Sequence, residues 1–448
     1  MQRKILDSLR KWLTSKDRKP LILRGARQVG KTWSVRELAE KENLYLLEIN
    51  FERNPELGEI FSEKNPDDVC RQLEIQYGTE LEKEKTLMFL DEVQSCPQVI
   101  TNLRWFYEEM PELAIVAAGS LLEFVLEDHD YSMPVGRVSF MQMEPMSFVE
   151  FLWAMGEEKL ADYLRDSYKK LKMSDIFHKK AMEYLRQYYL VGGMPAVVKA
   201  WAEEKNIKVC HEIQTDLMMS YREDFNKYRK KVPAEILRIT LNSTGLQLGE
   251  RFMYSHIDSD SRQPVLKEAL NMLVAAKLCK KICHTAGNGL PLGAEVKDKF
   301  FKIFALDTGL LMTTLGQQPI NEMQLCQTVW AGKGALAEQM VCQLLSAGMV
   351  PSEQDIFYWQ QSGSGNGEVD FLIQKDGAVT PIEVKAGASG SMKSLHAFME
   401  SKGLKKAYRL DINKPSSLMV DVKTNAGKPV AYELISLPIY MAEFLTEE

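Results

Sequence analysis

The chain has 448 residues, of which 45% are hydrophobic and 26% are charged. This is the composition of a globular protein and excludes a disordered or fibrous chain. At roughly 150 residues per domain, the length predicts about three domains. The formal net charge of −6 argues against a protein that coats nucleic acid or anionic membrane by bulk electrostatics, although a local basic groove is compatible with it. Seven scattered cysteines are typical of reduced thiols in a cytosol.

The sequence predicts neither export nor membrane insertion. The first twenty residues are basic but lack an apolar core and a small-residue cleavage site. The most apolar stretch, residues 113–126, is interrupted by Gly119, Ser120 and Glu123. A membrane-spanning helix needs roughly 18 continuous apolar residues. We therefore expect a cytoplasmic protein with no membrane partner.

A phosphate-binding motif follows the first predicted helix and strand. Apolar residues at helical spacing predict a helix near residues 5–13, and residues 21–24 are apolar enough for a short strand. The motif G-x-x-x-x-G-K-T comes next and is followed by a predicted helix over residues 33–41, which is the context that this motif requires. The loop comprises Gly25, Ala26, Arg27, Gln28, Val29, Gly30, Lys31 and Thr32.

Each part of this loop has a role in binding ATP with Mg²⁺. The glycines allow successive backbone N–H groups to point at phosphate oxygens, and the helix N-terminus adds partial positive charge. We expect Lys31 to reach the β- and γ-phosphates and Thr32 to ligate Mg²⁺. The alternative is a chance glycine turn.

A second buried strand supplies the carboxylates that such a site needs. Residues 87–90 are all apolar, as expected of a parallel strand buried on both faces, and Asp91 and Glu92 follow them. We expect Asp91 to hold Mg²⁺ through water and Glu92 to orient and polarise the attacking water. A single Asp would fit a metabolite kinase equally well, so the acidic pair is the informative feature. The alternative is a solvated Glu92 at a strand end.

Two further residues are candidates for contacts with the nucleotide. Residues 113–120 read as a strand that ends in Ser120, whose hydroxyl would lie beside the γ-phosphate, although it can equally be a plain strand-terminating serine. Arg137 opens another strand that runs to residue 143. Its guanidinium can contact the nucleotide of a neighbouring subunit or of its own chain. The alternative is a surface ion pair.

The motifs of the first 155 residues resemble a known family. GARQVGKT, LDEVQ, AAGS and GRVSFMQMEPMSFVEF are similar to segments of the AAA-like bacterial and archaeal ATPases of the AAA domain 14 group, which carry a C-terminal DUF4143 region. The resemblance implies that Lys31, Thr32, Asp91 and Glu92 form the ATP site and that the Gly-Arg pair ending at Arg137 is a family feature. The family often has a second hydroxyl after the serine of AAGS, where this chain has leucine.

The middle of the chain predicts helices and then a winged-helix order. Residues 148–230 are helix-rich, with apolar stripes that are typical of a core. From residue 233 onward the pattern is helix, helix, strand, loop and strand, which is the order of a winged helix, and the family resemblance points the same way. Such a unit can place a helix in a DNA groove or dock a protein. The lysines that would contact phosphate are Lys267, Lys277, Lys280, Lys281, Lys297 and Lys299.

Acidic residues and a lysine near the C-terminus predict a metal site. Asp370 and Glu383 lie on adjacent predicted strands, and Lys385 shares a face with Glu383 because side chains alternate along a strand. Glu338, in a predicted helix over residues 332–345, can add a ligand. Carboxylates that hold Mg²⁺, with a lysine that positions water or neutralises charge, are what phosphodiester hydrolysis needs.

This pattern resembles the PD-(D/E)xK nuclease superfamily. The helix glutamate, the strand aspartate and the Glu-x-Lys all match, whereas Val369 stands where the signature has proline. The resemblance implies that Asp370, Glu383 and Lys385 are catalytic and that Glu338 is a further metal ligand. The alternative is an ion pair between Glu383 and Lys385 in a degenerate fold.

Together these patterns predict an α/β protein of four parts. They are a P-loop ATPase domain with a parallel sheet (residues 1–155), a helical lid (156–230), a winged-helix-like domain (231–325) and a restriction-endonuclease-like domain (326–448). We expect ATP and Mg²⁺ as cofactors, and an ATPase that controls a nuclease acting on DNA or another nucleic acid. The alternative is an ATP-dependent switch or scaffold whose nuclease-like domain does not cleave. A homo-oligomer is expected only if Arg137 contacts a neighbouring subunit's nucleotide.

Overall fold

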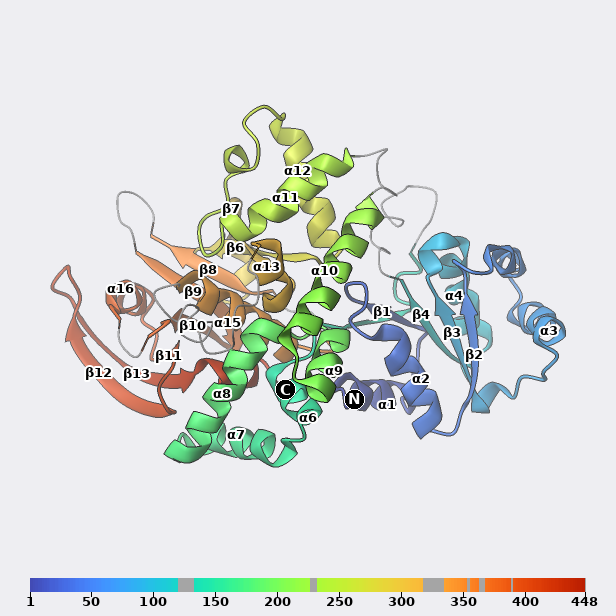
Figure 1. The fold of residues 1–448 in the computed structure, drawn as a ribbon, viewed down its shortest axis with the longest axis horizontal. Coiled ribbons are helices and arrows are strands. Elements are labelled where there is room, and N and C mark those ends of the chain that lie inside the picture. The colour runs from blue at the N-terminus through green and yellow to red at the C-terminus, as the bar shows by residue number, and fades with distance from the viewer. Residues whose placement is uncertain are drawn as a thin grey trace.

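Two β-sheets organise the chain, one of five strands and one of eight. The computed structural model describes residues 1–119, 133–225, 232–316, 334–352, 355–361, 367–387 and 390–447. Figure 1 shows the five-stranded sheet on the right and the eight-stranded sheet on the left, with the helices of residues 148–224 in green near the centre. Among the described residues, no helix is long and apolar enough to cross a bilayer.

The first sheet is entirely parallel, as the apolar runs in the sequence predict. Its strand order is β2-β3-β4-β1-β5. The strands are β1 (Leu21–Arg24), β2 (Tyr45–Asn50), β3 (Thr86–Asp91), β4 (Ala114–Ala118) and β5 (Ser139–Gln142). All residues of β3 and β4 are buried, because helices cover both faces of the sheet.

Two apolar cores lie on opposite faces of this sheet. Alternate residues of one strand serve both, since Leu87 and Phe89 join the core on one face whereas Met88 and Leu90 join the other. The helices here are α1 (Ile5–Leu13), α2 (Lys31–Lys41), α3 (Pro66–Tyr77) and α4 (Gln98–Glu109), with short 3₁₀ turns η1 (Pro55–Ser62), η2 (Lys83–Lys85) and η3 (Val93–Ser95). Residues of α1 and α2 line the first core, and those of α3 and α4 line the second.

The segment after β5 is helical, as predicted. A capping box at Ser147 and Glu150 begins the first of these helices. The helices are α6 (Phe148–Ala154), α7 (Glu158–Lys170), α8 (Asp175–Val191), α9 (Pro195–Glu204) and α10 (Ile207–Asp224). Their apolar stripes, including Leu185, Tyr188 and Tyr189, are core, which confirms the interpretation from the sequence.

The second sheet is mixed, with the order β12-β13-β11-β10-β9-β8-β6-β7. The pairs β10–β11, β11–β13 and β6–β8 are parallel, and the others are antiparallel. Its strands are β6 (Cys279–Thr285), β7 (Val296–Ala305), β8 (Phe357–Gln360), β9 (Glu368–Lys375), β10 (Ala378–Val384), β11 (Lys406–Asp411), β12 (Ser416–Lys423) and β13 (Pro429–Pro438).

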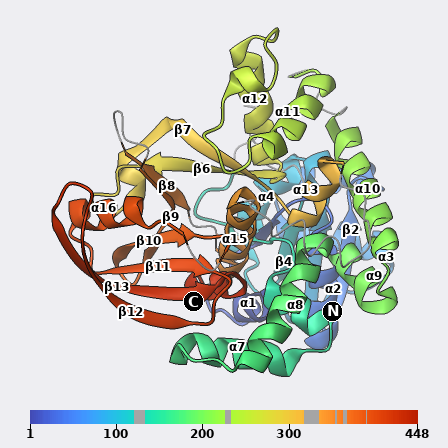
Figure 2. The ribbon, with the colours of Figure 1, turned by 60° about the vertical axis from the view of Figure 1, so that its left-hand side comes forward.

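The hairpin that the sequence suggested as a wing belongs to this second sheet. Strands β6 and β7 pair with each other, and β6 also pairs with β8, so the sheet continues across the boundary expected near residue 325. The two helices before the hairpin are α11 (Ala234–Leu246) and α12 (Gln263–Ala275), with η5 (Tyr254–His256) between them; η6 (Leu292–Glu295) and α13 (Thr308–Thr314) flank β7. Figure 2 shows the hairpin at one edge of the sheet and β12 at the other.

The remaining helices cover the second sheet and bring the chain ends together. Helix α15 (Gly334–Gly348) and the 3₁₀ segment η7 (Ile439–Leu445) share one core, and α16 (Lys393–Lys402) lies in another. Lys4, near the N-terminus, forms ion pairs of 2.7 Å with the buried Glu443 and with Glu447. The C-terminal segment is therefore tied to the start of α1.

Candidate functional site

The phosphate loop lies between β1 and α2, as the sequence predicts. Gly25 and Gly30 have positive φ values of 139° and 101°, which favour glycine. At Gly25 a Cβ would also lie 2.4 Å from the carbonyl oxygen of Met143, so the close approach of the backbone requires glycine. Ala26 and Val29 are buried in the core. These two residues can therefore offer a phosphate group only their backbone N–H groups.

Three residues outside the motif, one before α1 and two in α10, hold the loop in place. The side chain of Arg3 donates to the Val29 carbonyl at 2.7 Å. From α10, the Tyr221 hydroxyl donates to the Arg27 carbonyl at 2.8 Å, and Asp224 pairs with the Arg27 guanidinium at 2.6 Å. The sequence does not reveal these contacts, because Tyr221 and Asp224 lie almost 200 positions from the loop. Gln28 is exposed.

The predicted Mg²⁺ ligands are adjacent in space. The Thr32 hydroxyl donates to the Asp91 carboxylate at 3.1 Å, which joins the start of α2 to the end of β3. Burial, with repulsion from Glu92, raises the pKa of Asp91, because both effects disfavour the charged carboxylate. Lys31 is nearly buried, and its ammonium group donates to the carbonyls of Gly25 and Ala26 at 2.8 and 2.9 Å. This donor set of hydroxyl, carboxylate and ammonium fits Mg²⁺ with a nucleotide.

Glu92 lies directly after β3 and is held by a neighbour. Its backbone is left-handed, with φ 53° and ψ 44°, an uncommon conformation for a residue other than glycine. The Gln94 amide donates to its carboxylate at 2.5 Å. The side chain of the residue that follows Asp91 is thus held by Gln94.

The other two candidates for the nucleotide site have different outcomes. Ser120 lies outside the described residues. Arg137 precedes β5, and the parallel register of Leu21 with Ser139 places it at the end of the sheet opposite the phosphate loop. Its guanidinium pairs with Glu108 at 3.0 Å and is 44% exposed. The strand direction thus carries Arg137 away from the phosphate loop of its own chain, and its pairing with Glu108 is the surface ion pair that the sequence offered as the alternative.

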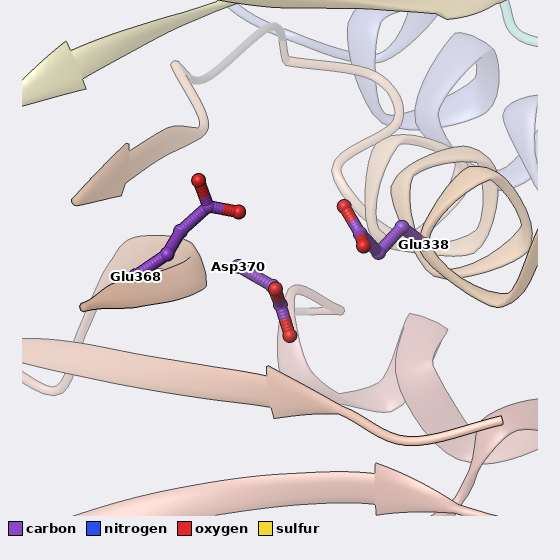
Figure 3. A group of neighbouring side chains, drawn as sticks. All are labelled: Glu338, Glu368 and Asp370. Atoms are coloured by element: carbon purple, nitrogen blue, oxygen red, sulfur yellow. The ribbon is translucent and has the colours of Figure 1, made fainter. Parts of the chain in front are cut away.

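The predicted metal ligands of the C-terminal part come together at one end of the second sheet. Figure 3 shows Glu338, which projects from α15 toward the strand that carries Glu368 and Asp370. One carboxylate oxygen of each of these three residues lies within 4.8 Å of the others. Asp370 accepts a hydrogen bond from the Val384 backbone N–H at 2.7 Å, which links β9 to the end of β10.

A fourth carboxylate, that of Glu383, joins these three, and Lys385 pairs with it. We call the four carboxylates the acidic cluster: Glu338, Glu368, Asp370 and Glu383. The Lys385 ammonium donates to one carboxylate oxygen of Glu383 at 2.5 Å, so the two side chains share a face as predicted. The other oxygen, Oε2, is buried and has no hydrogen-bond partner among the described residues. Leaving a buried carboxylate oxygen unpaired is costly, and a bound cation would satisfy it.

Lys302 is one of two members of the site that the sequence did not indicate, the other being Glu368. It lies in β7 and is completely buried, yet its ammonium group pairs with Glu338 at 3.0 Å and also with Glu368. The motif that resembles the nuclease signature includes neither Lys302 nor Glu368. Lys302 lies in β7, which the sequence assigns to a separate domain, and Glu368 lies in β9 two residues before Asp370. The only available signal was a lysine between Phe301 and Ile303, in a strand that should be buried.

The pKa values of all four carboxylates in the acidic cluster are raised. Burial raises the pKa of Glu338 to about 8, and the carboxylates of Asp370 and Glu368 add to this effect against the opposing Lys302. Burial and repulsion from Asp370 raise the pKa of Glu383 to about 8. The pKa values of Glu368 and Asp370 are also raised, mainly by burial. Perturbed groups of this kind are concentrated at functional sites.

The six lysines expected to contact phosphate do not share one surface. Lys267, Lys281 and Lys299 line a cavity of about 1090 Å³ beside α12, whereas Lys297 lines another of about 750 Å³. Lys280 instead pairs with Glu144 at 2.8 Å, and Lys277 lies at the turn after α12. The six lysines therefore do not form one continuous basic surface: four line two separate cavities, and Lys277 and Lys280 line neither of them.

Three family models match separate parts of the chain. Residues 17–152 match a model described as AAA domain. Residues 182–321 and 333–440 match two domains of unknown function, DUF8612 and DUF4143. Residues 17–152 are thus similar to an AAA domain, and this likeness implies nucleotide binding. No curated protein matches the sequence.

Solved structures with a detectable likeness share little sequence with this chain. One is the ORC2 protein of Aeropyrum pernix, solved as ADPNP-ADP complexes, with 12% identity and a TM-score of 0.32 over 74% of this chain and 96% of that one. Another is PCH-2 of C. elegans, with 14% identity and a TM-score of 0.24 over 45% of this chain and 60% of that one.

Proposed function

We propose that the protein is a Mg²⁺-dependent ATPase whose nucleotide state controls a metal-dependent nuclease site in the second sheet. The observation that carries the ATPase part is the contact between Thr32 and Asp91, at 3.1 Å, beside a phosphate loop that contains Lys31. Lys31 would bind the β- and γ-phosphates, and Thr32 and Asp91 would hold Mg²⁺, which neutralises charge on the phosphates. Glu92, fixed by Gln94, would orient the attacking water.

The nuclease part is supported by the acidic cluster and its two lysines. The unpaired Glu383 oxygen is the observation that fits a cation. Asp370 accepts a hydrogen bond from Val384, the residue after Glu383, and has a carboxylate oxygen within 4.8 Å of those of Glu338 and Glu368. A divalent ion held there supplies Lewis-acid activation of water and phosphodiester. Lys385, whose side chain is 22% exposed, would stabilise charge on the phosphate.

A basic hollow next to this cluster suggests where a nucleic-acid strand would lie. The cavity of about 750 Å³ reaches Gly367, which directly precedes Glu368. Lys297, Lys393 and Lys402 line it, and Trp359 offers an aromatic ring. Lysines bind phosphates, and an aromatic ring can stack on a base.

A cleavage assay tests the nuclease part against the alternative of a non-cleaving switch or scaffold. We expect purified protein with Mn²⁺ or Mg²⁺ to cut structured DNA, and Asp370→Ala and Lys385→Ala to lose this activity. Lys375→Ala, on the same strand as Asp370 but bonded to the Leu445 carbonyl, is the matched control. Equal background cutting by all four proteins, with every metal and nucleotide tried, would favour the switch or scaffold.

A continuous series of contacts joins the two sites and supports their coupling. Arg3 donates both to the Val29 carbonyl of the phosphate loop and to the Glu144 carbonyl, at 2.7 and 2.8 Å. The Glu144 carboxylate pairs with Lys280 of β6. Strand β6 pairs with β7, which carries Lys302 into the acidic cluster. A shift of the loop on nucleotide binding can thus reach the cluster through packed polar groups.

A substitution at Lys280, which removes its ion pair with Glu144, tests the coupling between the two sites. We expect ATP to change the cleavage rate of the unmodified protein and Lys280→Met to reduce that dependence several-fold, with ATP binding retained. Lys281→Met is the control, because Lys281 lies over the Phe301 ring instead of pairing with Glu144. An unchanged ATP dependence in Lys280→Met would remove this route.

A further inference from the structure

Lys302 brings a positive charge into the acidic cluster from a strand outside its sequence motifs. Its side chain is completely buried, and its ammonium group pairs with Glu338 and Glu368. The Tyr358 ring lies 5.5 Å from the ammonium group on another side. A buried lysine keeps its charge only where carboxylates compensate for its desolvation, and here the carboxylates of Glu338 and Glu368 accept hydrogen bonds from the Lys302 ammonium group.

The position of this ammonium group matters because it lies where a cation would bind. Glu338, Glu368 and Asp370 bring their oxygens within 4.8 Å of one another, close enough to share one ion. Two of these three carboxylates are already paired with Lys302. Asp370 instead accepts a hydrogen bond from the backbone N–H of Val384, the residue after Glu383. The Oε2 oxygen of Glu383 is buried and has no hydrogen-bond partner among the described residues.

We infer that Lys302 acts as a resident cation that takes one of two cation positions in the cluster, so that the site binds a single divalent ion between Asp370 and Glu383. Four carboxylates against the ammonium groups of Lys302 and Lys385 leave a formal charge of −2 when all are ionised, which one divalent ion balances. Without Lys302 the formal charge becomes −3, and a second ion becomes favourable beside Glu338 and Glu368.

Packing between α15 and β7 holds Glu338 close to Lys302. Gln339, adjacent to Glu338, bonds both the N–H and the carbonyl of Ala305 at 2.8 and 2.9 Å. Helix α15 is thus fixed against β7, and Glu338 is held within reach of Lys302. The resident cation is supplied by the β6–β7 hairpin, in the segment that precedes the DUF4143 match.

Counting bound Mn²⁺ tests this inference, which rests on the proposed metal site. The full-length chain would carry Asp91→Asn in every sample, so that the phosphate-loop site contributes no ion. We expect titration calorimetry and electron paramagnetic resonance to find one Mn²⁺ per chain with Lys302 present. In Lys302→Met we expect two, with the spectral broadening that neighbouring Mn²⁺ ions cause.

A charge-matched variant separates electrostatics from damage to the fold. Lys302→Met with Glu368→Gln restores the formal charge of −2, so we expect one ion again; thermal melting verifies folding of each variant. One ion in Lys302→Met with unchanged affinity, or two ions with Lys302 present, would overturn the inference. If the Asp91→Asn chain binds no Mn²⁺ and Asp370→Ala makes no difference, the proposed metal site itself fails.

Discussion

The phosphate-loop site and the acidic cluster are built in opposite ways. The first takes its ligands from eight consecutive residues and from the end of one other strand of the same sheet, where Asp91 and Glu92 lie. The second takes them from α15, β7, β9 and β10, which span more than eighty positions of the chain. A local site keeps its chemistry in a motif, whereas an assembled site depends on packing between distant elements.

The largest effect should come from removing the charge of the local site. We expect Lys31→Ala to lower ATP turnover about 1,000-fold, because a preorganised donor to the phosphates is lost from a water-poor site. A steady-state phosphate-release assay measures this. Lys41→Ala, at the exposed end of the same helix and paired with Glu37, is the control and should keep full turnover. Comparable activity of the two variants would contradict the role of Lys31.

Replacing Glu92 should slow ATP turnover by a smaller factor and leave ATP binding unchanged. We expect Glu92→Gln to slow hydrolysis about 100-fold, because an amide cannot polarise the attacking water, while ATP still binds through the loop. Single-turnover kinetics and calorimetry separate the two steps. Glu84→Gln, exposed before β3, serves as the control. Hydrolysis at the unmodified rate in Glu92→Gln would show that this carboxylate does not act on the water.

The assembled site should be sensitive to a residue that touches no metal ligand. Gln339→Ala leaves the buried N–H and carbonyl of Ala305 unpaired, so we expect a loss of about 2 kcal/mol in unfolding free energy and weaker Mn²⁺ binding at the cluster. ATP affinity should not change. Denaturant titration and calorimetry measure these quantities, and Gln76→Ala, exposed on α3, is the control. A matching loss of ATP affinity would mean that the sites are not built independently.

The smallest expected effect concerns the helix that braces the phosphate loop. Asp224→Asn weakens the pairing with Arg27, whose side chain is 33% exposed, and partly exposed ion pairs contribute only about 1 kcal/mol or less. We therefore expect ATP affinity to fall by no more than about fivefold, measured by fluorescence titration. Asp216→Asn, exposed on the same helix, should have no effect. Complete loss of binding would give α10 a direct role in the site.

Much of the local structure followed from sequence pattern. The strands and the helix around the phosphate loop lie where the apolar runs and the motif predict, and Glu383 and Lys385 share a face because strand side chains alternate. Arg137 shows the limit of such reasoning. Its Gly-Arg motif left a nucleotide contact and a surface ion pair open, and the direction of β5 decides which end of the sheet Arg137 reaches.

The sequence by itself determined the phosphate-loop motif, the acidic strand end and three members of the acidic cluster, since hydrogen-bonding chemistry and periodicity act over a few residues. Only the tertiary structure decided that the β6–β7 hairpin joins the second sheet and that Lys302 and Glu368 enter the cluster. Strand pairing between distant segments depends on the burial of the whole sheet, and no local pattern encodes which buried lysine will meet which carboxylate.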